Sequence, residues 1–164
     1  MYDGTSAGSE CVGVESNADG YTTCYNCVIE DLTSTNVTTG FWNVAVYNCY
    51  AGGLWKCFLS CAAGDYCSSS ITGTYAPPGA NSREGDASVD QFVSLGSDYH
   101  LKAGADLINV GNDAYSNEWD IDGPFSGTRN DIGCHEYVVA TSGHPTMRRL
   151  GGIPGMGLTG RVNW

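Results

Sequence analysis

The chain has 164 residues and a net charge of −11 at pH 7. Its length suits a single domain with a buried core. No stretch reaches the roughly 18 consecutive apolar residues of a membrane span, so we expect no membrane insertion. Residues 1–136 hold all 18 acidic residues and four of the seven basic ones, which gives −14 there and +3 in the tail. An acidic body repels phosphate backbones, so we expect no nucleic-acid partner.

The composition and one internal repeat predict an all-β fold. The chain contains 23 glycines and 10 tyrosines but no long helix-forming run, a balance typical of strands and tight turns. The segment YNCVIEDL at residues 25–32 returns 22 residues later as YNCYAGGL at residues 47–54. A repeat of this length is typical of a solenoid, in which each unit buries its inner face against a copy of itself. We therefore predict two neighbouring coils of a parallel β-helix.

The remaining segments are less regular. Residues 1–24 are predicted to form a divergent first coil. Counting back 22 residues from the repeat gives no match, so either a loop insertion shifts the register or the regular repeat begins only at about Thr22. Residues 54–72 are predicted to form a third coil, and the Gly- and Pro-rich residues 73–85 a loop. One short strand is expected within residues 89–95.

These boundaries divide the chain into three parts. Residues 1–75 contain the β-helix coils, residues 76–138 a loop and the C-terminal cap, and residues 139–164 an extended basic arm. Five glycines lie between Gly151 and Gly160, which predicts a segment that packs on another surface. The first coil exposes one end of the solenoid, and such an end needs a cover from an upstream segment or a neighbouring subunit.

The eight cysteines allow three interpretations. Cys24 and Cys27 have the spacing of a metal-binding pair, but no second close pair follows and the three histidines lie much later in the chain. Disulfides would fit an exported protein. Free thiols at equivalent positions of stacked coils, Cys27 and Cys49, form the third interpretation, a ladder of small buried side chains. We assign no metal ligand and no cofactor.

The later motifs carry a family resemblance. The chain contains Asp98-Tyr-His-Leu-Lys-Ala-Gly, Asp120-Ile-Asp-Gly and Asp131-Ile-Gly-Cys-His-Glu-Tyr. This order resembles the C-terminal end of a large group of right-handed parallel β-helix proteins, "DFHLxxGSPAIDAG … DIDGxxR … DIGAxEY", many of them anchored on bacterial surfaces and others in phage. The resemblance covers about residues 10–138 and implies a short right-handed parallel β-helix, with no activity attached. Cys134 and His135 depart from it, since small or acidic residues are usual there.

The coil comparison predicts no stacked carboxylate site. Glycan-cleaving enzymes need two carboxyl groups roughly 5 to 10 Å apart, which successive coils could supply. A spacing of 22 residues instead places Gly52 opposite Glu30 and Val37 opposite Glu15. No catalytic residue is assigned on this basis.

The acidic and histidine residues of the cap have structural explanations. Asp120 and Asp122 could belong to a calcium loop, but Pro124 stands where an oxygen ligand is needed, so turn capping by carboxylates is favoured. Asp131 and Glu136 are predicted to hold the closing strand against the end of the β-helix by accepting backbone hydrogen bonds. His100 is predicted to be a half-exposed strand residue, and the Cys134–His135 pair has no third group to make it a nucleophile.

Contacts with partners are predicted from exposed aromatic rings and from the basic arm. The candidate binding residues are Trp42, Tyr50, Trp55, Arg148 and Arg149. They favour a non-enzymatic structural or adhesive module of a cell surface, extracellular assembly or virion, which self-associates or contacts neighbouring subunits through the arm, with polysaccharide as a further partner. The alternative is a polysaccharide-acting enzyme, a lyase or glycosidase, or a carbohydrate-binding module on the same fold.

Overall fold

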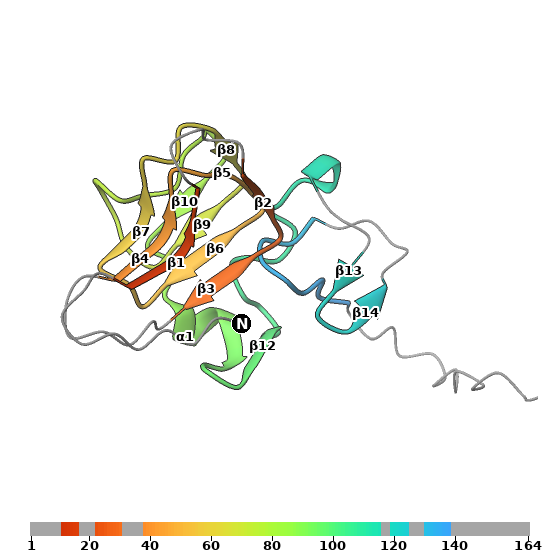
Figure 1. Cartoon of the computed structure of the whole chain (residues 1–164). Helices are drawn as coiled ribbons and strands as arrows, with labels where there is room; N and C mark the ends of the chain where they lie inside the picture. The colour runs from red at the N-terminus through yellow and green to blue at the C-terminus, as the bar shows by residue number, and fades with distance from the viewer. Residues whose placement is uncertain (1–10, 17–21, 31–37, 116–118, 125–129, 139–164) are drawn as a thin grey trace, which may run out of the picture.

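A computed structural model describes residues 11–16, 22–30, 38–115, 119–124 and 130–138. In these residues short parallel strands dominate and helix is almost absent, which confirms the all-β fold class. Figure 1 shows the parallel strands gathered in one stack, with α1 and β12 below β3 and with β13 and β14 drawn to one side. The predicted arm, residues 139–164, lies outside the described residues.

Three parallel sheets make up the stack, and within them each strand from β1 to β6 pairs with the strand three places further along the chain, while β10 pairs with β9. The first sheet has the order β1-β4-β7, with β1 at Cys11–Glu15, β4 at Thr38–Trp42 and β7 at Lys56–Leu59. The second has the order β2-β5-β8, with β2 at Thr23–Tyr25, β5 at Ala45–Tyr47 and β8 at Gly64–Asp65. The third has the order β3-β6-β9-β10, with β3 at Val28–Glu30, β6 at Tyr50–Gly52, β9 at Ser68–Ser69 and β10 at Arg83–Glu84.

The strand register confirms the sequence repeat and resolves its irregular start. Tyr25 pairs with Tyr47 and Glu30 with Gly52, both at the predicted spacing of 22 residues. In β1, however, Glu15 pairs with Trp42 and not with Val37, a spacing of 27 residues. The link between β1 and β2 is longer than the link between β4 and β5, so a loop insertion shifts the register. The strands β7, β8 and β9 lie within residues 54–72, where a third coil was predicted, and they pair in parallel with β4, β5 and β6.

The interior of the stack is filled by rows of side chains from successive strands. Phe41 and Phe58 are in register, and their rings stack with centroids 5.3 Å apart. Gly40 lies beside this pair, where a Cβ atom would come within 2.7 Å of the Cys57 carbonyl oxygen. The close approach of backbone and core explains why this strand position holds glycine.

Left-handed backbone turns join the strands at equivalent levels. Asn26 and Asn48 follow β2 and β5, and both have a φ of 51°. Asparagine visits this conformation more readily than other residues that carry a side chain. Their amides continue the stacking, because Asn26 N–H donates to the Tyr47 carbonyl and Asn48 N–H donates to the Asp65 carbonyl. The repeated asparagine therefore allows the left-handed turn, and its N–H group joins neighbouring turns.

The repeated cysteine forms the predicted ladder of free thiols, extended by a third member. Cys27, Cys49 and Cys67 each follow a left-handed turn, and each thiol donates to the carbonyl oxygen two residues earlier, at 3.2, 3.2 and 3.4 Å. Cys49 and Cys67 are fully buried. Seven cysteines are free in the described part of the chain, so no disulfide links them there.

Burial predicts that the interior thiols are unreactive in the folded protein. Burial raises the pKa of Cys49, and it raises the pKa of Cys57 to about 11, so roughly one Cys57 thiol in a thousand is ionised at pH 8. We expect a thiol reagent at pH 8 to modify the half-buried Cys61 before Cys49 and Cys57, with all three modified after denaturation. Peptide mapping by mass spectrometry gives the order, and early modification of Cys49 or a disulfide at that position would contradict the ladder.

The chain leaves the stack through residues that were predicted to be loop. β10 pairs with β9, so the third sheet continues beyond the predicted coil boundary at residue 75. The segment predicted to be one strand begins as a short helix, α1 at Ser88–Gln91, and continues as β11 at Phe92–Ser94. β11 pairs with β12, at Asp98–Leu101, in an antiparallel hairpin, and a 3-10 turn, η1, occupies Asp113–Tyr115. β13 at Trp119–Asp120 and β14 at Gly123–Pro124 form a second antiparallel pair.

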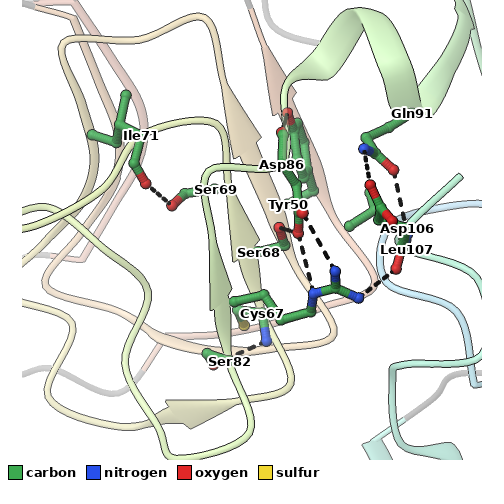
Figure 2. A network of polar contacts seen from close by, with 11 residues as sticks. Tyr50, Cys67, Ser68, Ser69, Ile71, Ser82, Asp86, Gln91, Asp106 and Leu107 are labelled. Carbon is green, nitrogen blue, oxygen red and sulfur yellow. Dashed lines mark hydrogen bonds and ion pairs between the residues drawn. The ribbon is translucent and has the colours of Figure 1, made fainter.

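A polar network attaches this cap to the stack (Figure 2). The Ser68 hydroxyl donates to the Asp86 carboxylate at 2.6 Å, and the Tyr50 hydroxyl donates to the Asp86 carbonyl at 2.8 Å. The Gln91 side chain accepts from the Leu107 amide. Around Tyr50 a second apolar cluster forms with side chains of the cap, among them Phe92. The third sheet is therefore covered by the cap on the side where Tyr50 lies.

Candidate functional site

The structure separates the predicted binding residues. The Trp55 side chain lies on the outside, 69 % exposed, between β6 and β7, and Trp42 is half-buried at the end of β4. Tyr50 is fully buried under the cap, with its ring against Phe92, which corrects the prediction of an outer position. Arg148 and Arg149 lie outside the described residues.

A row of tyrosines runs along the stack next to the asparagine turns. Tyr25 and Tyr47 stack with centroids 5.6 Å apart, and Tyr47 stacks on Tyr115 of η1 at 4.4 Å. Tyr66 lies 6.1 Å from Tyr115 in a tilted arrangement. We call these four residues the tyrosine row. Tyr25 is 42 % exposed and the others are half-buried, so the row offers part of its aromatic surface to solvent. The repeat predicted two of its members, whereas Tyr66 and Tyr115 were missed.

A second candidate site lies in the cap, where three segments meet. His100 comes from β12, Asp122 from the turn between β13 and β14, and His135 from the closing segment. One potential metal-ligating atom of each lies within 4.8 Å of the other two. The two imidazole rings are edge to face, with centroids 4.7 Å apart. We call these residues the His–Asp cluster. Two imidazoles and a carboxylate could hold a divalent cation.

The cluster opens into a groove of about 430 Å³. Its wall consists mainly of residues from the β13–β14 turn and the closing segment: Asp120, Asp122, Gly123, Pro124, His135, Glu136, Tyr137 and Val138. Three acidic residues, one histidine and one tyrosine therefore line a shared space. Such a lining favours cations and neutral hydroxyl-bearing ligands over anions.

Carboxylates control the charge of His100. Its Nε2 lies 3.0 Å from Asp122 Oδ1, and its Nδ1 contacts Asp98 Oδ1. Hydrogen bonds to Asp122 and to Asp98 raise the pKa of His100, and the His100 ring lowers the pKa of Asp98. His135 differs, because burial lowers its pKa. Protonation is therefore favoured at His100 and disfavoured at His135, which limits the repulsion between the two rings.

The carboxylates predicted to cap turns hold the segments that carry the cluster. Asp120 accepts hydrogen bonds from the Asp122 and Glu136 amides, at 3.2 and 2.8 Å. Asp131 accepts from the Asn109 and Tyr137 amides, and Glu136 accepts from the Asp131 amide. This confirms the predicted capping roles of Asp120, Asp131 and Glu136. Asp122 has a different role, because its carboxylate bonds to His100.

His100 is a half-exposed strand residue, as the alternating sequence around it predicted, but the sequence did not predict the cluster. His100 and His135 are 35 residues apart and belong to different segments, so no local spacing brings them together. Within the sequence, the potential catalytic partner next to His135 is Cys134. The signal available in the sequence was that three capping motifs each contained a potential ligand.

No helix in the described residues is long and apolar enough to cross a membrane. Comparison of the chain with protein-family models, with curated proteins and with solved structures found no significant match.

Proposed function

We propose that residues 11–84 form a short right-handed parallel β-helix closed by the C-terminal cap. Three parallel sheets whose strands follow one another in rotation support this proposal, because each group of three strands stacks on the preceding group. Left-handed turns at equivalent levels, such as Asn26 and Asn48, support it further. Crossover connections between parallel strands are right-handed in about 98 % of proteins, which favours that hand.

On this scaffold we propose a non-enzymatic structural or adhesive role at a cell surface, in an extracellular assembly or in a virion. The tyrosine row and the exposed Trp55 carry the proposal. Aromatic side chains that stay partly exposed next to regularly stacked strands are suited to contacts with proteins and with sugar faces. Among the strands that the structure describes, no two carboxylates pair across neighbouring strands, and Glu30 faces Gly52, so binding is favoured over the polysaccharide-cleaving alternative.

Partners of two kinds fit this role. A basic arm and an acidic body are complementary in charge, so Arg148 and Arg149 would bring the arm onto the body of a neighbouring copy. Polysaccharide would lie against the aromatic side chains. The arm contact predicts self-association that weakens with salt.

Replacing Trp55 tests the aromatic contact. We expect Trp55→Ala to weaken binding to a glycan array or to immobilised partner protein by about tenfold, in line with the loss of a contact worth 1–2 kcal/mol. The melting temperature should stay unchanged because the side chain is mostly exposed. Val89→Ala, another exposed apolar residue at 59 % exposure, is the control. Equal binding by both variants would contradict the role of Trp55, and shortened glycan products would favour the enzymatic alternative.

Sedimentation of the full chain tests the arm. We expect assemblies of the wild type at low salt that dissociate in the double variant Arg148→Glu, Arg149→Glu. The pair Lys56→Glu, Lys102→Glu makes the same charge change of −4 outside the arm, so it controls for net charge and should still assemble. A monomeric wild type at low salt would overturn self-association through the arm.

A further inference from the structure

The His–Asp cluster has a composition that the capping function does not explain. Asp120, Asp131 and Glu136 hold the cap together through backbone amides, whereas the side chains of His100, Asp122 and His135 converge on one another. The Asp122 side chain is 69 % exposed and His100 is 36 % exposed. A convergent set of three ligand-type side chains at the surface suits a bound ion better than a packing role.

We propose that His100, Asp122 and His135 form a binding site for a divalent transition metal ion, with Zn²⁺ as the best match. Imidazole nitrogen and carboxylate oxygen are common zinc ligands, and two histidines with one carboxylate form an established zinc ligand set. Ca²⁺ and Mg²⁺ prefer all-oxygen sites, which the two histidines do not provide.

The distances are close to those of a zinc site. Zn–N and Zn–O bonds of about 2.0–2.1 Å place the ligand atoms of a tetrahedral site about 3.3 Å apart. His100 Nε2 and Asp122 Oδ1 are already 3.0 Å apart, and the whole set lies within 4.8 Å. A change of about 1.5 Å at most in the separation of any two ligand atoms brings the set to that geometry.

The surroundings of His100 fit a metal ligand. Its Nδ1 contacts the Asp98 carboxylate, which fixes the proton on Nδ1 and directs Nε2 toward Asp122. Zinc-bound histidines usually have such a carboxylate or carbonyl partner on the second nitrogen. The metal would replace the proton now shared between His100 Nε2 and Asp122. Asp98 is therefore a positioning residue.

At His135 one hydrogen bond must change. The Leu101 amide donates to His135 Nδ1 at 3.1 Å, so the neutral ring carries its proton on Nε2. A cation on Nε2 requires that this proton move to Nδ1, which breaks the Leu101 bond, and a cation on Nδ1 takes the place of the amide. In both cases metal binding releases the Leu101 amide. This gives the site a signature that adventitious surface binding lacks.

The ligand set leaves a coordination position open. Three protein ligands satisfy three of the four positions of a tetrahedral zinc ion, and Asp122 and His135 both line the groove. Water or a ligand oxygen from the groove would take the fourth position. The site is therefore of the open type, with access from the face that contains Pro124 and Tyr137.

Zinc titration of the full chain, stripped with a chelator, tests the proposal. The free cysteines are first alkylated in the folded state so that exposed thiols do not contribute. We expect one equivalent of Zn²⁺ to bind to the wild type by calorimetry. His100→Gln and Asp122→Asn should abolish this equivalent, and Asp98→Asn should weaken it by roughly 10 to 100-fold. Asp90→Asn, which changes an exposed carboxylate that is not part of the cluster, should bind as the wild type does.

Nuclear magnetic resonance separates this site from other modes of binding. One equivalent of Zn²⁺ should shift the imidazole nitrogens of His100 and His135 and the Leu101 amide, and Asp122→Asn should lose all of these shifts. Because the Asp122 side chain is exposed, we expect this variant to fold as the wild type does. An unchanged melting temperature without metal checks this expectation. Absence of binding at about 100 μM Zn²⁺ overturns the proposal, because most protein zinc sites are saturated at far lower concentrations. So does a binding equivalent that survives in both His100→Gln and Asp122→Asn.

Discussion

Asn48→Ala is expected to lower the free energy of unfolding by about 3 kcal/mol. Asn48 is fully buried, and its side chain makes two hydrogen bonds to Asn112, accepting from the amide at 2.9 Å and donating to the carbonyl at 2.8 Å. Alanine removes both, leaves two backbone groups unpaired and is strained at a φ of 51°. The Asn48 carbonyl also accepts from the Gly133 amide, so this turn joins the stack to two segments of the cap.

Two further variants separate the side-chain contribution from the backbone contribution. Asn26→Ala changes the equivalent turn one level earlier, which has the same φ but a side-chain oxygen without a partner. It should cost about 1 kcal/mol. Asn48→Gly retains the left-handed backbone and should cost about 2 kcal/mol through the lost hydrogen bonds. Urea denaturation of the three variants provides the comparison, and equal losses for Asn48→Ala and Asn26→Ala would show that the contact with Asn112 contributes nothing.

Asp131→Ala is expected to cost about 3 kcal/mol at neutral pH. Asp131 is 2 % exposed, and its two carboxylate oxygens accept from the Asn109 amide at 2.7 Å and the Tyr137 amide at 2.5 Å. Asp131→Asn should lower the free energy of unfolding nearly as much, because the side-chain NH₂ group of asparagine would face one of these two backbone N–H groups, donor against donor. Urea denaturation measures both, and the exposed Asp90→Ala should stay within about 0.5 kcal/mol of wild type. If Asp131→Asn left the free energy of unfolding unchanged, the volume of the side chain, and not its hydrogen bonding, would matter at this position.

The same residue predicts a pH dependence with a definite sign. Burial raises the pKa of Asp131 above its ordinary value of about 3.9. The folded state therefore binds the proton more tightly than the unfolded state does. The contribution of Asp131 to stability is largest below the unfolded pKa and decreases as the pH rises through the folded pKa. We expect the stability difference between wild type and Asp131→Asn to be larger near pH 4 than at pH 7, and a difference that grows with pH would contradict the raised pKa.

The sequence by itself determined the parts of the fold that follow from local repetition. The recurrence of Tyr, Asn and Cys predicted the pairing of β2 with β5 and of β3 with β6, because stacked strands place equivalent residues opposite one another. It also predicted the free-thiol ladder at Cys27 and Cys49, and it indicated that Glu30 would face a glycine. Carboxylates in turn-forming motifs predicted the capping roles of Asp120, Asp131 and Glu136.

The tertiary structure alone decided which surfaces are inside and which side chains meet. Tyr50 was expected outside, but the cap covers β6, and strand alternation cannot show whether another segment packs on the outer face. Glu15 pairs with Trp42 because the length of the segment between β1 and β2 sets the register. The sequence of the strand itself does not show this register. The His–Asp cluster depends on how the β11–β12 hairpin, the β13–β14 pair and the closing segment pack together. Such long-range packing is fixed by contacts between residues far apart in the chain, and no spacing within the sequence encodes it.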